Sequence, residues 1–298
     1  MTRRWLTIAM ALMGILPVAL ALVGPWLTGA SPDTPVAGPF QPAAGGHLLG
    51  TDVLGRDVLA RVLVGGRTII WQAASATVFG SIVGLSVGLW SATTPHTRVA
   101  RAVLSLIDGI AAVPALLLLL VLAAGAPGDD VVVAVGIALV SVPFSVRINR
   151  DHAHRLAATD YARDAQARGE AWAGRIRFDI LPGLAPVALS EAGIRFVAAT
   201  QLAATAGFLG LGSGAPTANW GRMVRENLTG LTANALPVLV PCVLLVTLSV
   251  GVTLGLDRAA AARLSGAPSS GDATLVNRVA QLGDVTWVKR LSRIGRVL

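Results

Sequence analysis

Few residues in this sequence could carry chemistry, and their positions do not converge on a catalytic site. All four histidines lie outside the long apolar stretches: they are His47, His96, His152 and His154. A membrane hydrolase needs a nucleophile, a base and oxyanion donors within one span. No His-Glu-x-x-His motif occurs, and the Gly-x-Ser-x-Gly string at Gly84–Gly88 lies in an apolar stretch without a histidine. The only lysine, Lys289, is preceded by Val288, so the Gly-Lys of a nucleotide-binding P-loop is also missing. We therefore expect no enzyme activity and no metal or cofactor bound by this chain.

Glu191, Arg195 and Asp108 are ionisable residues inside apolar stretches. Glu191 and Arg195 are four residues apart with the acid first, which is the favourable order for a pair on one side of a helix. Asp108 lies in another stretch, two helical turns after Arg101. Because a charge exposed to lipid is costly, all three should face protein or water. We expect Glu191 and Arg195 to form a structural pair, with a ligand contact in the pathway as the alternative. Asp108 stays open between a structural role near the membrane surface and a role in gating.

Residues 160–182, called the charged segment below, form the longest charged interval between two apolar stretches. Apolar residues still recur within it, so a helix there would have one side for the rest of the protein and a polar side for a soluble partner. Gly169 is expected to break this helix, and Leu181-Pro182 to end it. From the residues alone, an ordinary amphipathic surface loop is the alternative.

The composition indicates a membrane protein. Of the 298 residues, 54% are hydrophobic and 13% are charged, whereas soluble domains carry roughly 25% charged residues. The net charge of +8 comes from arginines that cluster beside apolar stretches, which is typical of membrane orientation rather than of nucleic-acid binding. The single cysteine, Cys242, excludes an intramolecular disulfide and a cysteine-based metal cluster.

Six apolar stretches approach the roughly 20 residues that a helix needs to cross a bilayer. They are Trp5–Val23, Ile69–Ser91, Val103–Ala124, Val131–Ile148, Leu184–Phe208 and Ala235–Leu256. The first follows Arg3 and Arg4, as in a signal peptide, but it runs on past the small residues at 19–21, which favours a retained helix. The sequence therefore predicts an all-α polytopic membrane protein with six transmembrane helices.

The distribution of positive charge predicts the orientation of these helices. If the N-terminus is cytoplasmic, most of the 24 Arg and Lys residues fall in cytoplasmic segments. The two termini and the charged segment would then all lie in the cytoplasm.

Glycines repeat every four residues in two of the stretches. Gly80, Gly84 and Gly88 share one helical face, as do Gly251 and Gly255. Small residues let helix backbones approach closely in lipid, so these faces predict packing seams, with lining of a transport pathway as the alternative.

The segment between the first two stretches predicts a short amphipathic helix on the outer surface. Between His47 and Ile70, apolar residues recur at three- and four-residue spacing. Asp52 and Asp57 lie around the expected start, where a helix N-terminus favours negative charge.

The same segment carries a string that is very similar to a family signature. It runs Leu-Gly-Thr-Asp-x-Leu-Gly-Arg-Asp-Val-Leu-x-Arg from Leu49 to Arg61. It resembles the signature of the second, C-type membrane subunit of dipeptide, oligopeptide and nickel importers. The signature positions, which the resemblance places on the extracytoplasmic side, are Gly50, Thr51, Asp52, Gly55, Arg56 and Asp57.

A second string resembles the segment that follows the fifth span in the same family. It begins Gly-Phe-Leu-Gly-Leu-Gly at Gly207 and continues to Trp220 and Met223. In that family the segment lies outside the membrane, near the docked binding protein.

The charged segment resembles the cytoplasmic "EAA" loop of ATP-binding-cassette (ABC) importer permeases, which forms the helix that contacts the partner ATPase. The positions that the resemblance assigns to this coupling role are Tyr161, Asp164, Ala165, Gly169, Glu170, Ala171, Leu181 and Pro182. The sequence departs from the motif at Arg163, where the family has Glu, and at Asp164, where it has Ala.

The resemblance implies a type I permease subunit of a bacterial ATP-driven importer that works by alternating access. The partners implied are two ABC ATPase subunits or a fused pair, a homologous second permease, an extracytoplasmic solute-binding protein and the lipid of the inner membrane, with no nucleic acid. ATP and Mg would be bound by the ATPase subunits. The substrate would be a di- or oligopeptide, nickel or another small ligand. The alternative is a secondary carrier or channel independent of ATP, which would need acids deep in several spans.

The expected domain organisation has three parts. Residues 1–68 would hold the first transmembrane helix and the outer amphipathic segment. Residues 69–265 would form a five-helix core with the coupling loop at 149–183. Residues 266–298 place apolar and basic residues at helical spacing, which predicts either a helix on anionic lipid or a disordered tail.

Overall fold

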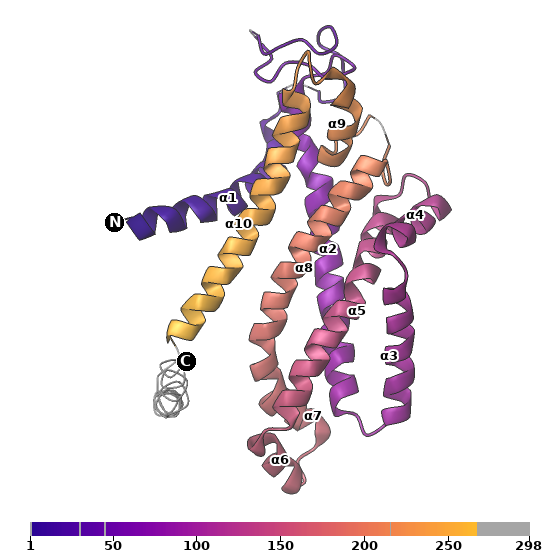
Figure 1. The fold of residues 1–298 in the computed structure, drawn as a ribbon, viewed down its shortest axis with the longest axis vertical. Coiled ribbons are helices and arrows are strands. Elements are labelled where there is room, and N and C mark those ends of the chain that lie inside the picture. Colours follow the sequence, from indigo (N-terminus) through magenta and orange to yellow (C-terminus); the bar gives the residue numbers. More distant parts are fainter. Residues whose placement is uncertain (1, 30, 45, 215, 267–298) are drawn as a thin grey trace, which may run out of the picture. The chain divides into compact units, whose positions relative to one another are not determined.

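A computed structural model describes residues 2–29, 31–44, 46–214 and 216–266. The predicted tail helix after residue 266 lies outside them. Within the described residues the regular structure is helical, with isolated bridges and no strand. The helices are α1 Thr2–Leu27, α2 Val58–Thr93, α3 Thr97–Ala112, α4 Ala115–Gly125, α5 Asp130–Ala157, α6 Asp160–Ala167, α7 Trp172–Arg175, the π-helical turn η1 Ile176–Ile180, α8 Leu181–Leu209, α9 Trp220–Asn227, the 3-10 turn η2 Leu228–Gly230 and α10 Leu236–Gly266 (Figure 1).

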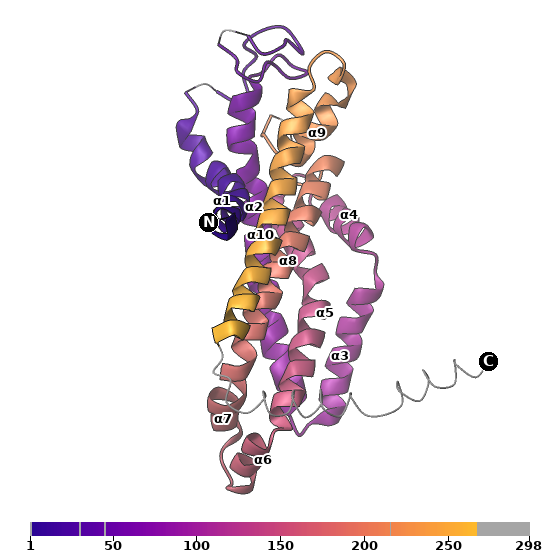
Figure 2. The same ribbon diagram turned by 60° about the vertical axis from the view of Figure 1, so that its left-hand side comes forward.

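The chain divides into two units, Met1–Asp257 and Arg258–Leu298, and the contacts that follow lie within the first. In it α5 packs along α2, α8 packs on both, and α1 lies against α2 (Figures 1 and 2). The irregular residues before α2 and the helix α9 lie at one end, and α6 and α7 lie at the other.

Four of the described helices are long and apolar enough to cross a membrane. They are α2, α5, the continuous helix Trp172–Leu209 and the part Leu236–Leu256 of α10. The pair α3 and α4 would make a fifth span, and Met13–Leu27 is a shorter apolar helix. The helical, multi-pass architecture is confirmed, whereas six spans and cytoplasmic termini stay predictions.

The expected single helix over Val103–Ala124 is wrong, because α3 and α4 meet at an angle of 88°. The bend lies at Val113 and Pro114. Proline disfavours the α-helical conformation in the residue before it, and Val113 is extended, with φ −78° and ψ 128°. An apolar stretch of the length of a span is thus split into two helices of different direction.

The seam between α2 and α5 confirms the packing role predicted for the glycines of α2. A Cβ atom at Gly84 would lie 2.2 Å from the Ser145 hydroxyl oxygen, and one at Gly88 would lie 2.9 Å from the Cβ of Asn149. In α10, a Cβ at Gly251 would lie 2.1 Å from the backbone nitrogen of Gly14, whereas one at Gly255 would have nothing within 4 Å. The second predicted seam is therefore half correct.

The short amphipathic helix expected over His47–Ile70 is wrong. Residues 47–57 form turns and a bridge between Thr51 and Asp57, and residues 58–70 are the first turns of the long helix α2. Asp57 is the N-cap of α2, and its carboxylate accepts hydrogen bonds from the backbone N–H groups of Leu59 and Ala60. The helical spacing in the sequence was real, but it belonged to a membrane helix rather than to a surface one.

Candidate functional site

The signature residues meet at one end of the protein, in a region called the cap below. It comprises the irregular residues 31–57 (position 45 is not described), residues 213–219 (position 215 is not described), α9 and residues 228–234. Asp52, which is fully buried, organises it: Oδ1 accepts from the N–H groups of Leu54 and Arg56, both at 2.9 Å, and Oδ2 accepts from Arg56 Nε at 2.7 Å. Gly55 has φ +74°, and a Cβ there would lie 2.1 Å from the Ala37 carbonyl oxygen. The turn around Asp52 therefore requires glycine at this position.

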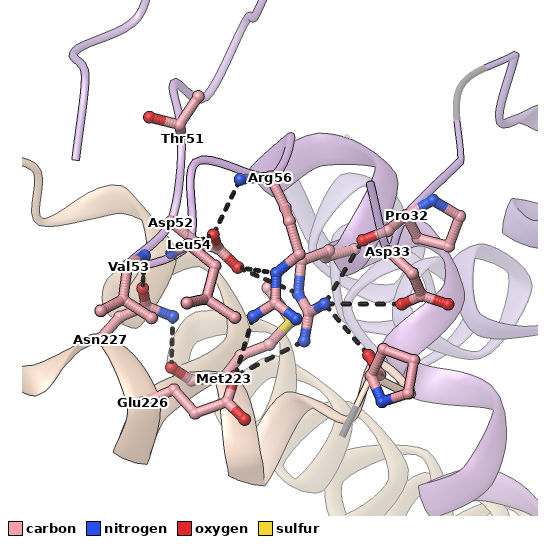
Figure 3. Close-up of polar contacts among 12 residues, drawn as sticks. Pro32, Asp33, Thr51, Asp52, Val53, Leu54, Arg56, Met223, Glu226 and Asn227 are labelled. Carbon is pink, nitrogen blue, oxygen red and sulfur yellow. Dashed lines mark hydrogen bonds and ion pairs between the residues drawn. The ribbon is translucent and has the colours of Figure 1, made fainter. Parts of the chain in front are cut away.

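Two buried arginines tie Asp52 to segments far away in the sequence (Figure 3). Arg56 Nη2 donates to Glu226 Oε2 of α9 at 3.2 Å. Arg61 Nε lies 3.3 Å from Asp52 Oδ2, and Arg61 Nη1 lies 3.6 Å from Asp33 Oδ1. Arg61 Nη1 also donates to the carbonyl oxygens of Pro32 and Pro216. Buried charges are stable only when paired in this way, so the network fixes how three segments of the cap pack together.

Uncharged side chains close the rest of the cap. Asn227 accepts from the Val53 N–H at 2.9 Å and donates to the Met223 carbonyl at 2.8 Å. The Thr51 hydroxyl donates to the Gly38 carbonyl at 2.7 Å, and the Asn234 amide donates to the Gln41 carbonyl at 3.1 Å. Sequence reasoning missed Glu226, Asn227 and Asn234, because no local pattern links them to the signature.

The second string, from Gly207 to Met223, folds against the first. Trp220 is fully buried, and its ring N–H donates to the Val62 carbonyl of α2 at 2.8 Å. The guanidinium of Arg222 in α9 donates to the carbonyls of Thr217 and Ser213, and burial lowers the pKa of Arg222. The two strings that the sequence analysis treated separately therefore build one structure.

The charged segment lies at the opposite end. α6 ends before Gly169, whose φ is +77°, so the predicted break is confirmed. The prediction that Leu181-Pro182 ends the helix is wrong, because the helix continues from Trp172 through Leu209. Pro182 lies two residues after the π-helical turn η1, so its missing N–H coincides with a local change of helix type rather than with the end of the helix.

α6 has two different faces. Ala162 and Ala165 are buried, whereas Tyr161, Arg163 and Asp164 are exposed. After the break, Gly169, Glu170 and Ala171 are exposed as well, Leu181 is half-buried and Pro182 is exposed. The charged segment thus offers a charged, aromatic surface to a partner while its small apolar side holds it to the protein.

Side-chain contacts fix the rest of the charged segment. Arg168 Nη2 donates to Glu170 Oε1 at 2.7 Å, and this hydrogen bond raises the pKa of the exposed Arg168. The Trp172 ring N–H donates to the Thr93 carbonyl at the end of α2, at 3.2 Å. Ile180 is buried in a small apolar cluster with residues of α2, α5 and α8. A force applied to α6 or α7 would therefore reach the long helices directly.

Four ionisable residues inside the apolar stretches form two pairs. Arg195 Nε donates to Glu191 Oε1, so the predicted pairing is confirmed, and the Ser145 hydroxyl donates to Glu191 Oε2 at 3.0 Å. Asp108 pairs with Arg147 of α5, whose Nη2 lies 2.6 Å from Asp108 Oδ1. Within the described residues, no three His, Cys, Asp or Glu side chains gather as a metal site would require.

Comparison with known sequences groups this chain with membrane transport proteins. Residues 84–262 match the family described as binding-protein-dependent transport system inner membrane component. The chain is 33% identical over 228 residues to a putative peptide transport system permease protein of Brucella suis, covering 76% of each chain. It is 30% identical over 220 residues to the probable D,D-dipeptide transport system permease protein DdpC of Escherichia coli, covering 74% of each. A di/tripeptide transport system permease protein of Pseudomonas aeruginosa is 32% identical over 220 residues, covering 70% of this chain and 71% of that one.

A solved structure shares the fold. A chain of the MetNI methionine ABC transporter in an inward-facing conformation matches with a TM-score of 0.56 and 21% identity. The match covers 69% of this chain and 95% of the other. At this identity the likeness concerns the arrangement of helices alone.

Proposed function

Because the chain belongs to the family of binding-protein-dependent transport system inner membrane components, and is a permease subunit of an ABC importer in a bacterial inner membrane, we propose that it moves a short peptide. The observation that carries this proposal is the similarity, over about three quarters of the chain, to permeases named for peptide, dipeptide and di/tripeptide transport. Among the substrates that the sequence left open, nickel has no comparable support.

The charged segment would be the surface that receives the ATPase. Its exposed face carries Tyr161, Arg163 and Asp164, and its other face is anchored by Ala162 and Ala165. Two ATPase subunits, or a fused pair, would bind ATP and Mg, and their closure would move α6. The continuous helix from Trp172 to Leu209 would carry that movement through the membrane and change the side to which the pathway is open.

The cap would then lie on the extracytoplasmic side of the membrane and face a solute-binding protein, with both termini in the cytoplasm. Its buried network gives it a fixed shape, which suits a surface that a separate protein must recognise repeatedly. A homologous second permease would supply the other half of the pathway.

Co-purification tests the role of the charged segment. The complex is purified in mild detergent with the native chain and with an Arg163→Glu/Asp164→Arg variant, which changes only exposed side chains of α6. We expect the ATPase to be retained by the native chain and lost from the variant. The matched control is Arg98→Glu, an exposed arginine at the same end of the protein, in α3, which should retain the ATPase. Full retention by both variants would refute the assignment.

Uptake in proteoliposomes tests the substrate. The complete transporter with its binding protein should accumulate a labelled dipeptide only when ATP and Mg are supplied on the ATPase side. Accumulation without ATP would favour the secondary-carrier alternative. ATP-driven uptake of other solutes with no uptake of peptides would support the importer assignment and refute the peptide as its substrate.

A further inference from the structure

The ion pair of Asp108 and Arg147 is unusual in its exposure. It joins α3 to α5, with Arg147 Nη2 2.6 Å from Asp108 Oδ1, yet the two side chains remain 55% and 53% exposed. Arg147 lies in the candidate span α5, and Asp108 lies in α3, which counts as a span only together with α4. The neighbouring pair of Glu191 and Arg195 is different, with side-chain exposures of only 4% and 16%.

The exposed pair continues into an aromatic surface. Phe144 lies three residues before Arg147 in α5, so both side chains project from the same face of the helix. Phe144 is 45% exposed, and the Arg195 guanidinium lies 4.9 Å from the centre of its ring. This face of α3 and α5, called the polar stripe below, consists of Asp108, Phe144 and Arg147.

Other outward faces of the protein have a different composition. Along α10 the exposed side chains in the apolar span carry no charge, and the large ones are the aliphatic Leu239, Val243, Val246 and Val250. An aliphatic face suits lipid, whereas charged side chains within spans are costly there and face the interior of a bundle or a water-filled cavity. The contrast indicates that α10 meets lipid and that the polar stripe meets water.

We propose that the polar stripe lines the transport pathway and that Asp108 and Arg147 bind the main chain of the peptide in transit. The proposal rests on the proposed function for the identity of the substrate. The geometry suits a peptide because Arg147 Nε and Nη2 both donate to the same oxygen, Asp108 Oδ1. Among the described residues, Asp108 Oδ2 and Arg147 Nη1 have no partner. One acceptor and one donor therefore stand side by side, which complements the N–H and C=O of a peptide group and its charged ends.

Thiol labelling tests whether the polar stripe meets water. In the assembled transporter in membranes, with Cys242→Ala as background, Phe144→Cys should react with a membrane-impermeant thiol reagent. Val243→Cys on α10 has a similarly exposed side chain and should not react, because lipid covers it. A saturating dipeptide should slow labelling at position 144. Equal labelling at the two positions, or labelling of position 243 alone, would overturn the proposal.

Transport kinetics test the contact with the substrate. Asp108→Asn and Arg147→Gln should each raise KM for a dipeptide by about tenfold, the loss expected for one charged hydrogen bond, with little change in kcat. Asp151→Asn breaks another exposed ion pair of α5, with Arg155, and should leave KM unchanged. If the pair only supports the fold, the variants will lower the yield of assembled complex while KM stays at the native value.

The outcomes separate this inference from the proposed function. ATP-driven peptide uptake by the native transporter without labelling at position 144 would refute the polar stripe and leave the peptide importer intact. Labelling at position 144 in a transporter that takes up no peptide would keep the water-lined face and refute the peptide as its ligand.

Discussion

The cap and the charged segment use the same residue types in opposite ways. In the network of the cap and the start of α2, Asp52 and Arg61 are fully buried and Arg56 nearly so, and the two arginines reach Glu226 and Asp33 in other segments. In the charged segment, Arg168 and Glu170 are 56% and 41% exposed and pair with each other across two residues. Removing one partner from a buried pair costs much free energy, whereas exposed pairs contribute little. The charges of the cap therefore stabilise its structure, whereas those of the charged segment are exposed and can contact a partner protein.

The largest effect is expected from Asp52→Asn. This change leaves Arg56 and Arg61 buried without their common carboxylate, which should lower the free energy of unfolding by about 3–5 kcal/mol. Thermal unfolding of the purified chain in detergent measures it. Adding Arg61→Met should recover part of the loss, since it removes one unpaired charge. A midpoint unchanged by Asp52→Asn would show that the network does not hold the cap together.

Ala165→Glu should act on the charged segment alone. Ala165 is fully buried on the inner face of α6, and a charge there should detach the helix at a local cost of about 3 kcal/mol. Limited trypsin digestion should then cut at Arg163 and Arg168 more than tenfold faster, while the thermal midpoint that reports on the cap stays the same. The matched control is Ala167→Glu, which places the same side chain at an exposed position. Similar cleavage of both variants would mean that the buried side of α6 does not anchor it.

A smaller loss is expected from Asn227→Ala. Two hydrogen bonds disappear, to the Val53 N–H and the Met223 carbonyl, and both are in the interior of the cap. The free energy of unfolding should fall by about 2 kcal/mol. Thr229→Ala, at an exposed position nearby, should have no effect on the thermal midpoint. An equal effect of the two changes would mean that the Asn227 hydrogen bonds do not stabilise the cap.

The smallest effect is expected from Glu170→Gln. It breaks the exposed pair with Arg168 and removes the hydrogen bond that raises the pKa of that arginine. No change of the thermal midpoint is expected. If this variant unfolded as readily as Asp52→Asn, the distinction between the two regions would be wrong.

Local patterns in the sequence predicted local structure well. The pairing of Glu191 with Arg195 and the break at Gly169 each depend on a few neighbouring residues, and each is confirmed. The glycine seam of α2 also follows from residues on one helical face.

Features that depend on competing local signals were predicted poorly. The spacing of Leu54 predicts part of an apolar helix. In the structure its N–H donates to the Asp52 carboxylate instead, and the chain forms a turn there. Pro182 predicts the end of a helix, yet the helix continues through it, beside a π-helical turn. Pro114, inside a stretch with the composition of a span, was not recognised as a bend.

Contacts distant in sequence could not be predicted at all. Asp52 and Glu226 come together only when the whole fold brings α9 against the start of α2, and nothing near either residue in the sequence indicates the other. The partner of Asp108 was missed for the same reason, since Arg147 lies on a different helix. The coupling role of the charged segment stays a prediction for the experiments above.

The helix from Trp172 to Leu209 extends from the charged segment to the residues that pack against α9. Its 38 residues correspond to about 57 Å at 1.5 Å per residue, nearly twice the roughly 30 Å of the hydrocarbon core. A tilt of about 1° about one end displaces the other by about 1 Å over this length. At the far end, a Cβ on Gly207 would lie 2.2 Å from the Asn219 side-chain oxygen that caps α9. Because Gly207 and Asn219 are in such close contact, a rotation of the helix about its end beside η1 would displace the residues under the cap by about 1 Å per degree.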